Sequence, residues 1–129
     1  EPFLVGAAVN GVLAHRLVRR VCDKCKQETT ATDEMSEFLE LNGMPGVTLW
    51  MGEGCDKCRN TGYSGRVGIY ELLVVDDSIR DVIARNPNVS EFRRMCIERG
   101  MTPLRTDGLT KASQGLTTVQ EVLRVTESH

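Results

Sequence analysis

Four cysteines in two CxxC pairs are the residues of this sequence whose types and spacing most clearly suggest chemistry. Cys22 and Cys25 form the first pair, Cys55 and Cys58 form the second, and 29 residues separate the two pairs. A CxxC turn directs two sulfur atoms toward one point, and two such turns together give the four-thiolate tetrahedron that zinc prefers. Four protein ligands leave no position open for a substrate, so the spacing predicts a structural zinc site.

Two other uses of the four cysteines stay open at this point. Disulfides within a CxxC are strained and mostly redox-active, and the first residues contain no secretory leader that would indicate an oxidising compartment. An iron site of the rubredoxin kind also uses paired CxxC turns with wide spacing. A rubredoxin usually has glycine soon after the second cysteine of each pair, whereas this chain has Lys26 and Arg59 there.

Basic residues flank both cysteine pairs. Four thiolates around a divalent ion carry a net charge of about −2, and nearby cations would offset that charge and lower the pKa values of the thiols. The same residues can also be read as a basic surface patch. They are Arg19, Arg20, Lys24, Lys26, Lys57 and Arg59.

The fifth cysteine and the two histidines do not extend the predicted metal site. Cys96 shares a helical face with Phe92 and Met95, which predicts a buried thiol and not a ligand. His15 lies in a predicted strand, and we interpret it as a structural or surface residue. His129 is the last residue and is far from His15 in the sequence.

The chain lacks three common motifs of enzymes and nucleotide-binding proteins. The sequence contains no GxxxxGK[ST], no HExxH and no GxSxG. Asp76 and Asp77 read as a helix start, where carboxylates meet the positive end of the dipole. We therefore expect no catalytic and no nucleotide-binding residue in the chain, which by itself should be inactive.

Composition narrows the class of protein further. The 129 residues include 16 basic and 18 acidic side chains, for a formal charge of −2, which argues against a general nucleic-acid binder. An apolar fraction of 40% and a charged fraction of 26% are ordinary for a globular protein. No run of eighteen apolar residues occurs, so no membrane insertion is expected. The chain lacks a starting methionine, and we expect it to be a piece of a longer protein.

In the first half of the chain, short predicted helices and strands alternate. Residues 1–9 read as the end of a helix. Residues 11–21 read as a strand, with a helix as the alternative. Between the cysteine pairs we expect a helix from Thr32 or Asp33 to Gly43, and then a short strand over 47–51. Residues 60–65 read as a turn, and the clearest strand covers 66–75.

Four helices are predicted after residue 75, with their own caps and apolar faces. The first covers 76–86, with Ile79, Val82 and Ile83 on one face. The second is capped by Ser90 and ended by Gly100, and the third runs from Thr102 and Pro103 to Gly115. In the last, Thr118 and Glu121 form a predicted capping box, with Val119, Val122 and Leu123 facing inward.

Three stretches together resemble the C-terminal part of the type II secretion and type IV pilus-assembly ATPases. They are GVLAHRLVRRVCDKC, GCDKCRNTGYSGRVGIYELLVVDDSIRDVI and DGLTKASQGLTTVQEVLRVT, in this order. The resemblance covers nearly the whole chain and is weak only over residues 27–51. It maps Cys22, Cys25, Cys55 and Cys58 onto the metal-binding element of the family. The family often has glutamine at the position of His15.

The resemblance implies a fold class and a division of the chain. It implies an α+β fragment with the end of a RecA-like ATPase domain at 1–21, and a tetracysteine zinc element at 22–65. A strand returning to the core would follow at 66–75, and a helical C-terminal subdomain at 76–129. The motifs that bind ATP and Mg²⁺ would lie before Glu1, in the parent protein.

The resemblance also implies partners and a location. The parent would be a cytoplasmic hexamer, peripheral to the bacterial inner membrane, that hydrolyses ATP to assemble pilin-like subunits. Its partners would be the other subunits of the hexamer and an inner-membrane platform protein. A stand-alone zinc ribbon that binds nucleic acid or protein remains as the alternative, supported by the basic residues near the first cysteine pair.

Overall fold

The computed structural model describes residues 11–73, 79, 81, 84–85 and 88–127. The predicted helix end at 1–9, most of the predicted helix at 76–86 with its Asp76–Asp77 start, and His129 lie outside these residues. The chain divides into two compact units, one formed by residues 1–15 and 70–104 and the other by residues 16–69 and 105–129. No helix among the described residues is long and apolar enough to cross a membrane.

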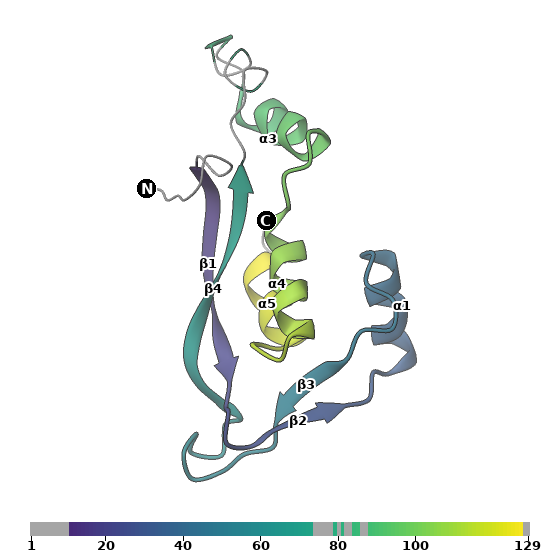
Figure 1. Cartoon of the computed structure of the whole chain (residues 1–129), viewed down its shortest axis with the longest axis vertical. Coiled ribbons are helices and arrows are strands. Elements are labelled where there is room, and N and C mark those ends of the chain that lie inside the picture. Colours follow the sequence, from purple (N-terminus) through teal and green to yellow (C-terminus); the bar gives the residue numbers. More distant parts are fainter. Residues whose placement is uncertain (1–10, 74–78, 80, 82–83, 86–87, 128–129) are drawn as a thin grey trace. The chain divides into compact units, whose positions relative to one another are not determined.

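Two long strands, β1 (Gly11–Val21) and β4 (Tyr63–Leu73), pair in a two-stranded sheet. Their arrows run in opposite directions (Figure 1). Period-two alternation buries Ile69, Glu71 and Leu73 of β4, because successive side chains of a strand point to opposite faces. The strand predicted over 11–21 is confirmed. The strand predicted from residue 66 begins at Tyr63 instead, because the preceding turn is tighter than expected.

The segment between the cysteine pairs contains two strands and one helix. Strands β2 (Lys26–Thr29) and β3 (Leu49–Gly52) pair antiparallel, with Lys26 opposite Gly52 and Thr29 opposite Leu49. Helix α1 (Asp33–Leu41) lies between them in the sequence (Figure 1). The Thr32 hydroxyl accepts a hydrogen bond from the Met35 amide at 3.1 Å, which confirms Thr32 as the N-cap. Strand β2 was not predicted, because three of its four residues are exposed polar side chains.

Helices α4 (Leu104–Ser113) and α5 (Val119–Thr126) share a hydrophobic core with this segment. Val119 and Val122 face inward as predicted. The core consists of buried residues from α1, β3 and both helices: Leu39, Leu49, Leu109, Ala112, Val119 and Val122. Gly108 makes the packing of α4 possible, because a Cβ there would lie 2.7 Å from Val122 Cγ1.

The end of α4 and the loop between α4 and α5 are hydrogen-bonded to residues 21–62, which we call the tetracysteine segment. The Trp50 indole donates to the Ser113 carbonyl at 3.3 Å, and the Lys26 ammonium donates to the Gly115 carbonyl at 3.1 Å. The Val21 amide donates to the Leu116 carbonyl at 3.0 Å. The last two helices and the tetracysteine segment are therefore parts of one compact unit.

In the other unit, helix α3 (Val89–Glu98) packs beside the end of β4. Cys96 is fully buried among Leu73, Ile79 and Met101, which confirms the predicted buried thiol. Asn88 is the N-cap, and its side chain accepts from the Glu91 amide at 2.8 Å, so the prediction of Ser90 was wrong by two residues. Asn88 forms the cap because its extended backbone places the amide oxygen over the first turn.

Among the described residues, two carboxylates are buried, one in each unit. Glu71 of β4 accepts hydrogen bonds from the Arg93 guanidinium and from the Leu104 amide. Glu121 of α5 is 2% exposed and accepts four hydrogen bonds from Arg19 and Arg124, between 2.7 and 3.0 Å long. Thr118 caps α5 as predicted, by accepting from the Glu121 amide at 3.1 Å. The Glu121 side chain, however, does not complete the expected capping box, since its oxygens accept from the two arginines.

The bonds to Glu121 hold it in its charged form. Burial alone would raise the pKa of this carboxyl, but the bonds from Arg124 and Arg19 outweigh burial and lower the pKa of Glu121 from 4.5 to about 2. A carboxyl whose pKa is lower in the folded state than in the unfolded state stabilises the fold at neutral pH.

We expect Glu121→Gln to lower the free energy of unfolding by about 2 kcal/mol at pH 7. This is below the range for a fully buried ion pair, because both arginines remain half exposed and can be hydrated. The difference from the wild type should be complete above about pH 4.5 and should shrink as the pH falls toward 2. Urea unfolding at several pH values measures it. The matched control is Glu98→Gln on the exposed end of α3, and an equal loss in both variants would contradict the assignment.

Candidate metal centre

The structure brings the four predicted cysteines together. Each offers one sulfur atom, and all four sulfurs lie within 4.8 Å of one another. Three of the Sγ–Sγ distances are short: 3.7 Å for Cys22–Cys55, 3.8 Å for Cys25–Cys58 and 3.7 Å for Cys55–Cys58. Among the described residues, this is the one group of three or more cysteine, histidine or acidic side chains that could hold a metal ion.

These distances fit a tetrahedral metal site and exclude disulfides. A Zn–S bond of about 2.3 Å gives a tetrahedron whose sulfur–sulfur edge is about 3.8 Å. A disulfide would instead need two sulfurs about 2.05 Å apart. All five cysteines are free thiols, so the disulfide alternative from the sequence is wrong for this structure. The edge length does not separate zinc from iron, whose bonds to thiolates are similar in length.

Each cysteine pair lies in the connection between two consecutive strands. Cys22 directly follows β1, and Cys25 directly precedes β2. The second pair occupies the connection between β3 and β4. The Cys22 amide donates to the Gly62 carbonyl at 2.9 Å, and the Glu53 amide donates to the Cys25 carbonyl at 3.1 Å. Backbone hydrogen bonds between the two cysteine turns therefore hold the sulfurs close together without a metal.

Two glycines allow the second turn to close on itself. A Cβ atom at Gly52 would lie 2.1 Å from the Gly62 carbonyl oxygen, so no side chain fits at this crossing. Arg59 and Asn60, directly after Cys58, have φ values of 56° and 63° in the left-handed region. Such a pair of residues reverses the chain sharply and is uncommon outside glycine and asparagine. The turn predicted at 60–65 therefore begins earlier, at Arg59.

Backbone amides surround the sulfur atoms with hydrogen-bond donors. Burial raises the pKa of the Cys58 thiol, but the amides of Gly62 and Cys55, at 3.2 and 3.3 Å, outweigh burial and lower its pKa to about 6. The Gly54 amide, at 3.2 Å, lowers the pKa of Cys25, but burial and the neighbouring thiols raise it to about 11. Four close thiols compete to ionise, and a divalent cation removes that competition.

The predicted lowering of a thiol pKa by nearby basic side chains is not seen at Cys22. The pKa of Cys22 is lowered against burial by backbone amides of Cys25 and Lys24 and by Cys55, and not by basic side chains. Two of the six predicted cations have other partners. Lys26 binds the Gly115 carbonyl and lies 5.5 Å from the Trp50 ring, and Arg19 binds Glu121 and lies 4.2 Å from the Tyr63 ring.

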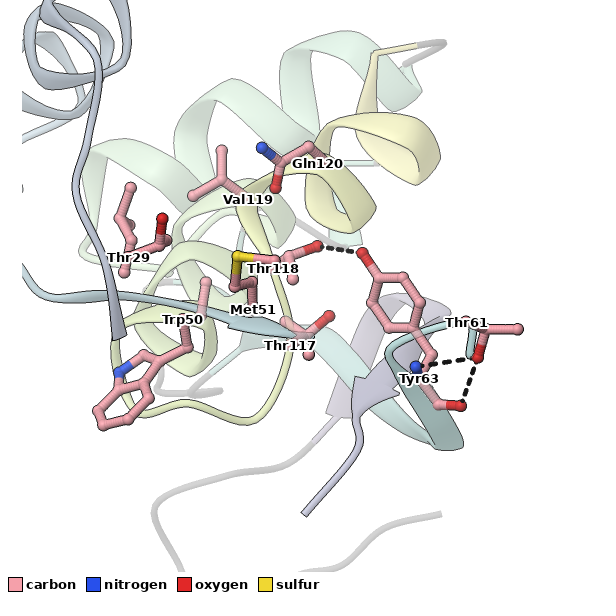
Figure 2. A pocket seen from close by; sticks show the side chains of 12 residues that line it. Thr29, Trp50, Met51, Thr61, Tyr63, Thr117, Thr118, Val119 and Gln120 are labelled. Atoms are coloured by element: carbon pink, nitrogen blue, oxygen red, sulfur yellow. Dashed lines mark hydrogen bonds between the residues drawn. The ribbon is translucent and has the colours of Figure 1, made fainter. Parts of the chain in front are cut away.

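A cavity of about 330 Å³ lies between β3 and the start of α5. Figure 2 shows Trp50, Met51 and Tyr63 among its lining residues, with the Tyr63 hydroxyl directed at Thr118. These two hydroxyl oxygens are 2.9 Å apart. Its described lining contains no histidine, cysteine, lysine, arginine, aspartate or glutamate. The cavity therefore offers hydroxyl groups and apolar surface but no carboxylate, imidazole, thiol or amine.

The remaining candidate residues lie away from the metal cluster. His15 is exposed, with its ring 5.0 Å from the Tyr70 ring, as expected for a surface residue. Cys96 belongs to the other core and is not a ligand. Sequence reasoning missed the Arg19–Glu121–Arg124 group. Only the spacing of Glu121 and Arg124 along one helix could have indicated it, since Arg19 is 102 residues away.

Comparison with known proteins gives relatives over almost the whole chain. The family described as "Type II/IV secretion system protein" matches residues 1–124. A protein named "Type IV pilus assembly ATPase PilB" from Thermus thermophilus is 48% identical over 125 residues, which are 95% of this chain and 14% of that protein. "Type II secretion system protein E" from Klebsiella pneumoniae is 44% identical over 127 residues, which are 98% of this chain and 25% of that protein.

A third relative, "Type II secretion system ATPase E" from Vibrio cholerae, is 40% identical over 128 residues. The chain spans a quarter or less of the length of these three relatives. The resemblance drawn from the cysteine pairs and the SGRVGIYELL strand is confirmed, as is the mixed α+β class with a four-cysteine cluster and C-terminal helices. The chain belongs to the Type II/IV secretion system protein family.

Proposed function

We propose that this chain is the C-terminal, zinc-bearing portion of a hexameric motor ATPase that powers assembly of a pilus or a secretion pseudopilus. The family match over residues 1–124 supports this proposal, as do relatives named as ATPases of pilus assembly and type II secretion. The motor would work in the cytoplasm, peripheral to the bacterial inner membrane. Its partners would be the other subunits of the hexamer and an inner-membrane platform protein.

We further propose that Cys22, Cys25, Cys55 and Cys58 bind one structural zinc ion. The observation that carries this is that four sulfurs lie within 4.8 Å of one another and that three of their six separations, at 3.7–3.8 Å, match the edge of a zinc–thiolate tetrahedron. When bound, zinc would neutralise the thiolates and hold the two turns together. All four positions around it would be taken by protein sulfurs, so the site gives no access to a water or a phosphate.

The roles of the segments follow from the same proposal. Residues 1–21 would end a RecA-like core, 22–65 would form the zinc element, 66–75 would return to the core and 76–129 would form a helical subdomain. ATP and Mg²⁺ would bind elsewhere in the parent protein. Helices α4 and α5 share a hydrophobic core with the zinc element. We therefore expect them to lose stability when the metal is lost.

Zinc analysis of the purified chain should give about one ion per chain. Cys55→Ser removes one sulfur from the tetrahedron, and we expect it to lose most of the metal. Cys96→Ala is the matched control, because Cys96 is buried in the other core and should leave the zinc content unchanged. Inductively coupled plasma mass spectrometry measures both. Iron in place of zinc, or full zinc content in Cys55→Ser, would contradict the proposed site.

Removal of zinc with a chelator should loosen α4 and α5 together with residues 22–62. The reason is that the end of α4 and the loop after it accept hydrogen bonds from Val21, Lys26 and Trp50. Hydrogen exchange of the zinc-loaded and chelated chain should show lost protection in both helices and unchanged protection in α3. Protection retained in α4 and α5 would show that the helices are stable without the metal.

In the full-length protein, Cys55→Ser should impair pilus formation or secretion more than ATP hydrolysis. A site with four sulfur ligands takes no part in hydrolysis, so its loss should affect how motion is transmitted. The measurement is paired: ATP turnover of gel-filtered hexamers, and pilus formation or secretion in cells. Intact hexamers without turnover would place the zinc element within reach of the catalytic step. ATP hydrolysis by the isolated 129-residue chain would contradict its assignment as a portion without the nucleotide site.

A further inference from the structure

Three arginines line a groove on the unit formed by residues 16–69 and 105–129. A cavity of about 450 Å³ is lined by Leu17, Val18, Arg19, Arg66 and Arg124. A second, of about 300 Å³, is lined by Arg19, Thr61, Tyr63, Gly65 and Arg66. Arg19 and Arg66 line both cavities, so the two adjoin and form one surface feature, which we call the arginine groove. No acidic residue is among these lining residues.

Among the described residues, Glu121 is the carboxylate that binds the groove arginines, and all its acceptor positions are used. Glu121 accepts two hydrogen bonds from Arg19 and two from Arg124. An ionised carboxylate has about four lone-pair sites, so Glu121 is saturated. It lies beneath the arginines with 2% exposure and balances one of the three positive charges. The groove therefore carries an excess of positive charge that Glu121 cannot neutralise.

Most of the guanidinium donors in the groove remain available. A guanidinium has about five N–H donors, and Glu121 takes one side-chain donor of Arg19 and two of Arg124. Arg66 is exposed, and its side chain makes no hydrogen bond or ion pair with any residue that the structure describes. The Arg19 guanidinium also lies over the Tyr63 ring, which limits its movement. Apart from the bonds to Glu121, the guanidinium donors of the groove have no acceptor among the residues that the structure describes.

An apolar side chain lies beside these donors. Leu17 lines the groove and is 45% exposed, while its neighbour Val18 is fully buried. A bare inorganic anion would gain nothing from Leu17. A protein segment with carboxylates next to an apolar side chain would use both the guanidinium forks and Leu17.

We propose that the arginine groove is a docking site for an acidic segment of another protein, with carboxylates binding Arg66, Arg19 and Arg124 and an apolar residue covering Leu17. Charge complementarity identifies the class of partner. The existing Arg19–Glu121 and Arg124–Glu121 pairs show that two of these arginines donate hydrogen bonds to a carboxylate in this geometry. The site is separate from the four cysteines, and the proposal does not rest on metal binding or on motor function.

The test is an NMR titration of the zinc-loaded chain that follows the Arg Nε–Hε signals. The probe is the peptide GEELEELEEG at physiological ionic strength, and the matched peptide GQQLQQLQQG retains its apolar residues without the charges. We expect saturable shifts of the groove arginines with the acidic peptide and binding weaker by about tenfold or more with the neutral one. The loss of one charge-assisted hydrogen bond corresponds to a change of about that size.

Arg66→Glu is the informative variant, because Arg66 has no described partner whose loss would unfold the chain. It should weaken binding of the acidic peptide by about tenfold or more. Arg94→Glu, an equal charge change on an exposed residue of α3, should leave binding within about twofold. Unchanged circular dichroism and zinc content would verify that both variants fold.

Four results would overturn the proposal. They are no saturable shift at millimolar peptide, equal binding of the two peptides, equal weakening by Arg94→Glu, and tighter binding of inorganic phosphate than of the acidic peptide at the same arginines. The last result would make the groove a phosphate site.

Discussion

The convergence of four strand ends on one group of sulfur atoms is the constraint on which the rest of this structure depends. The first CxxC turn joins β1 to β2, and the second joins β3 to β4. The two long strands and the β2–β3 pair thus meet at the cysteines. Their relative directions are fixed by two turns of a few residues, where bonds such as that from the Cys22 amide to the Gly62 carbonyl leave little freedom.

Helices α4 and α5 pack and hydrogen-bond against the residues around the cysteine turns, and together they form one compact unit. Their loop accepts hydrogen bonds from Val21, just before the first cysteine pair, and from Lys26, just after it, and the end of α4 accepts one from Trp50 of β3. The buried apolar residues of α1 and β3 are few, and they complete their core only with those of α4 and α5. Neither half has enough apolar surface to form a separate core, so the cysteine turns and the C-terminal helices stabilise each other.

The sequence predicted features that have a signature of residue types, and it missed the long-range contacts that have none. The strand at 11–21, the caps at Thr32 and Thr118 and the cysteine cluster follow from local patterns of apolar, capping and ligand residues. Strand β2 has no such pattern, since KQET is stabilised by its partner β3. The crossing of Gly52 over Gly62 and the reach of Arg19 to Glu121 are long-range contacts. The cap at Asn88 was missed because Ser90, two residues later, is an equally suitable capping residue by type.

The saturated Glu121 restricts how any ligand can use the arginine groove. A ligand that pulled Arg19 or Arg124 away would leave the buried Glu121 carboxylate without a partner, which is unfavourable in a protein interior. A ligand that binds the outward donors instead leaves Glu121 paired and adds charge where the groove lacks it. Arg19 is the third residue before Cys22, and its backbone amide also donates to Glu121. Binding in the groove would therefore act on the strand that leads into the first cysteine turn and on helix α5, through one residue that already connects them.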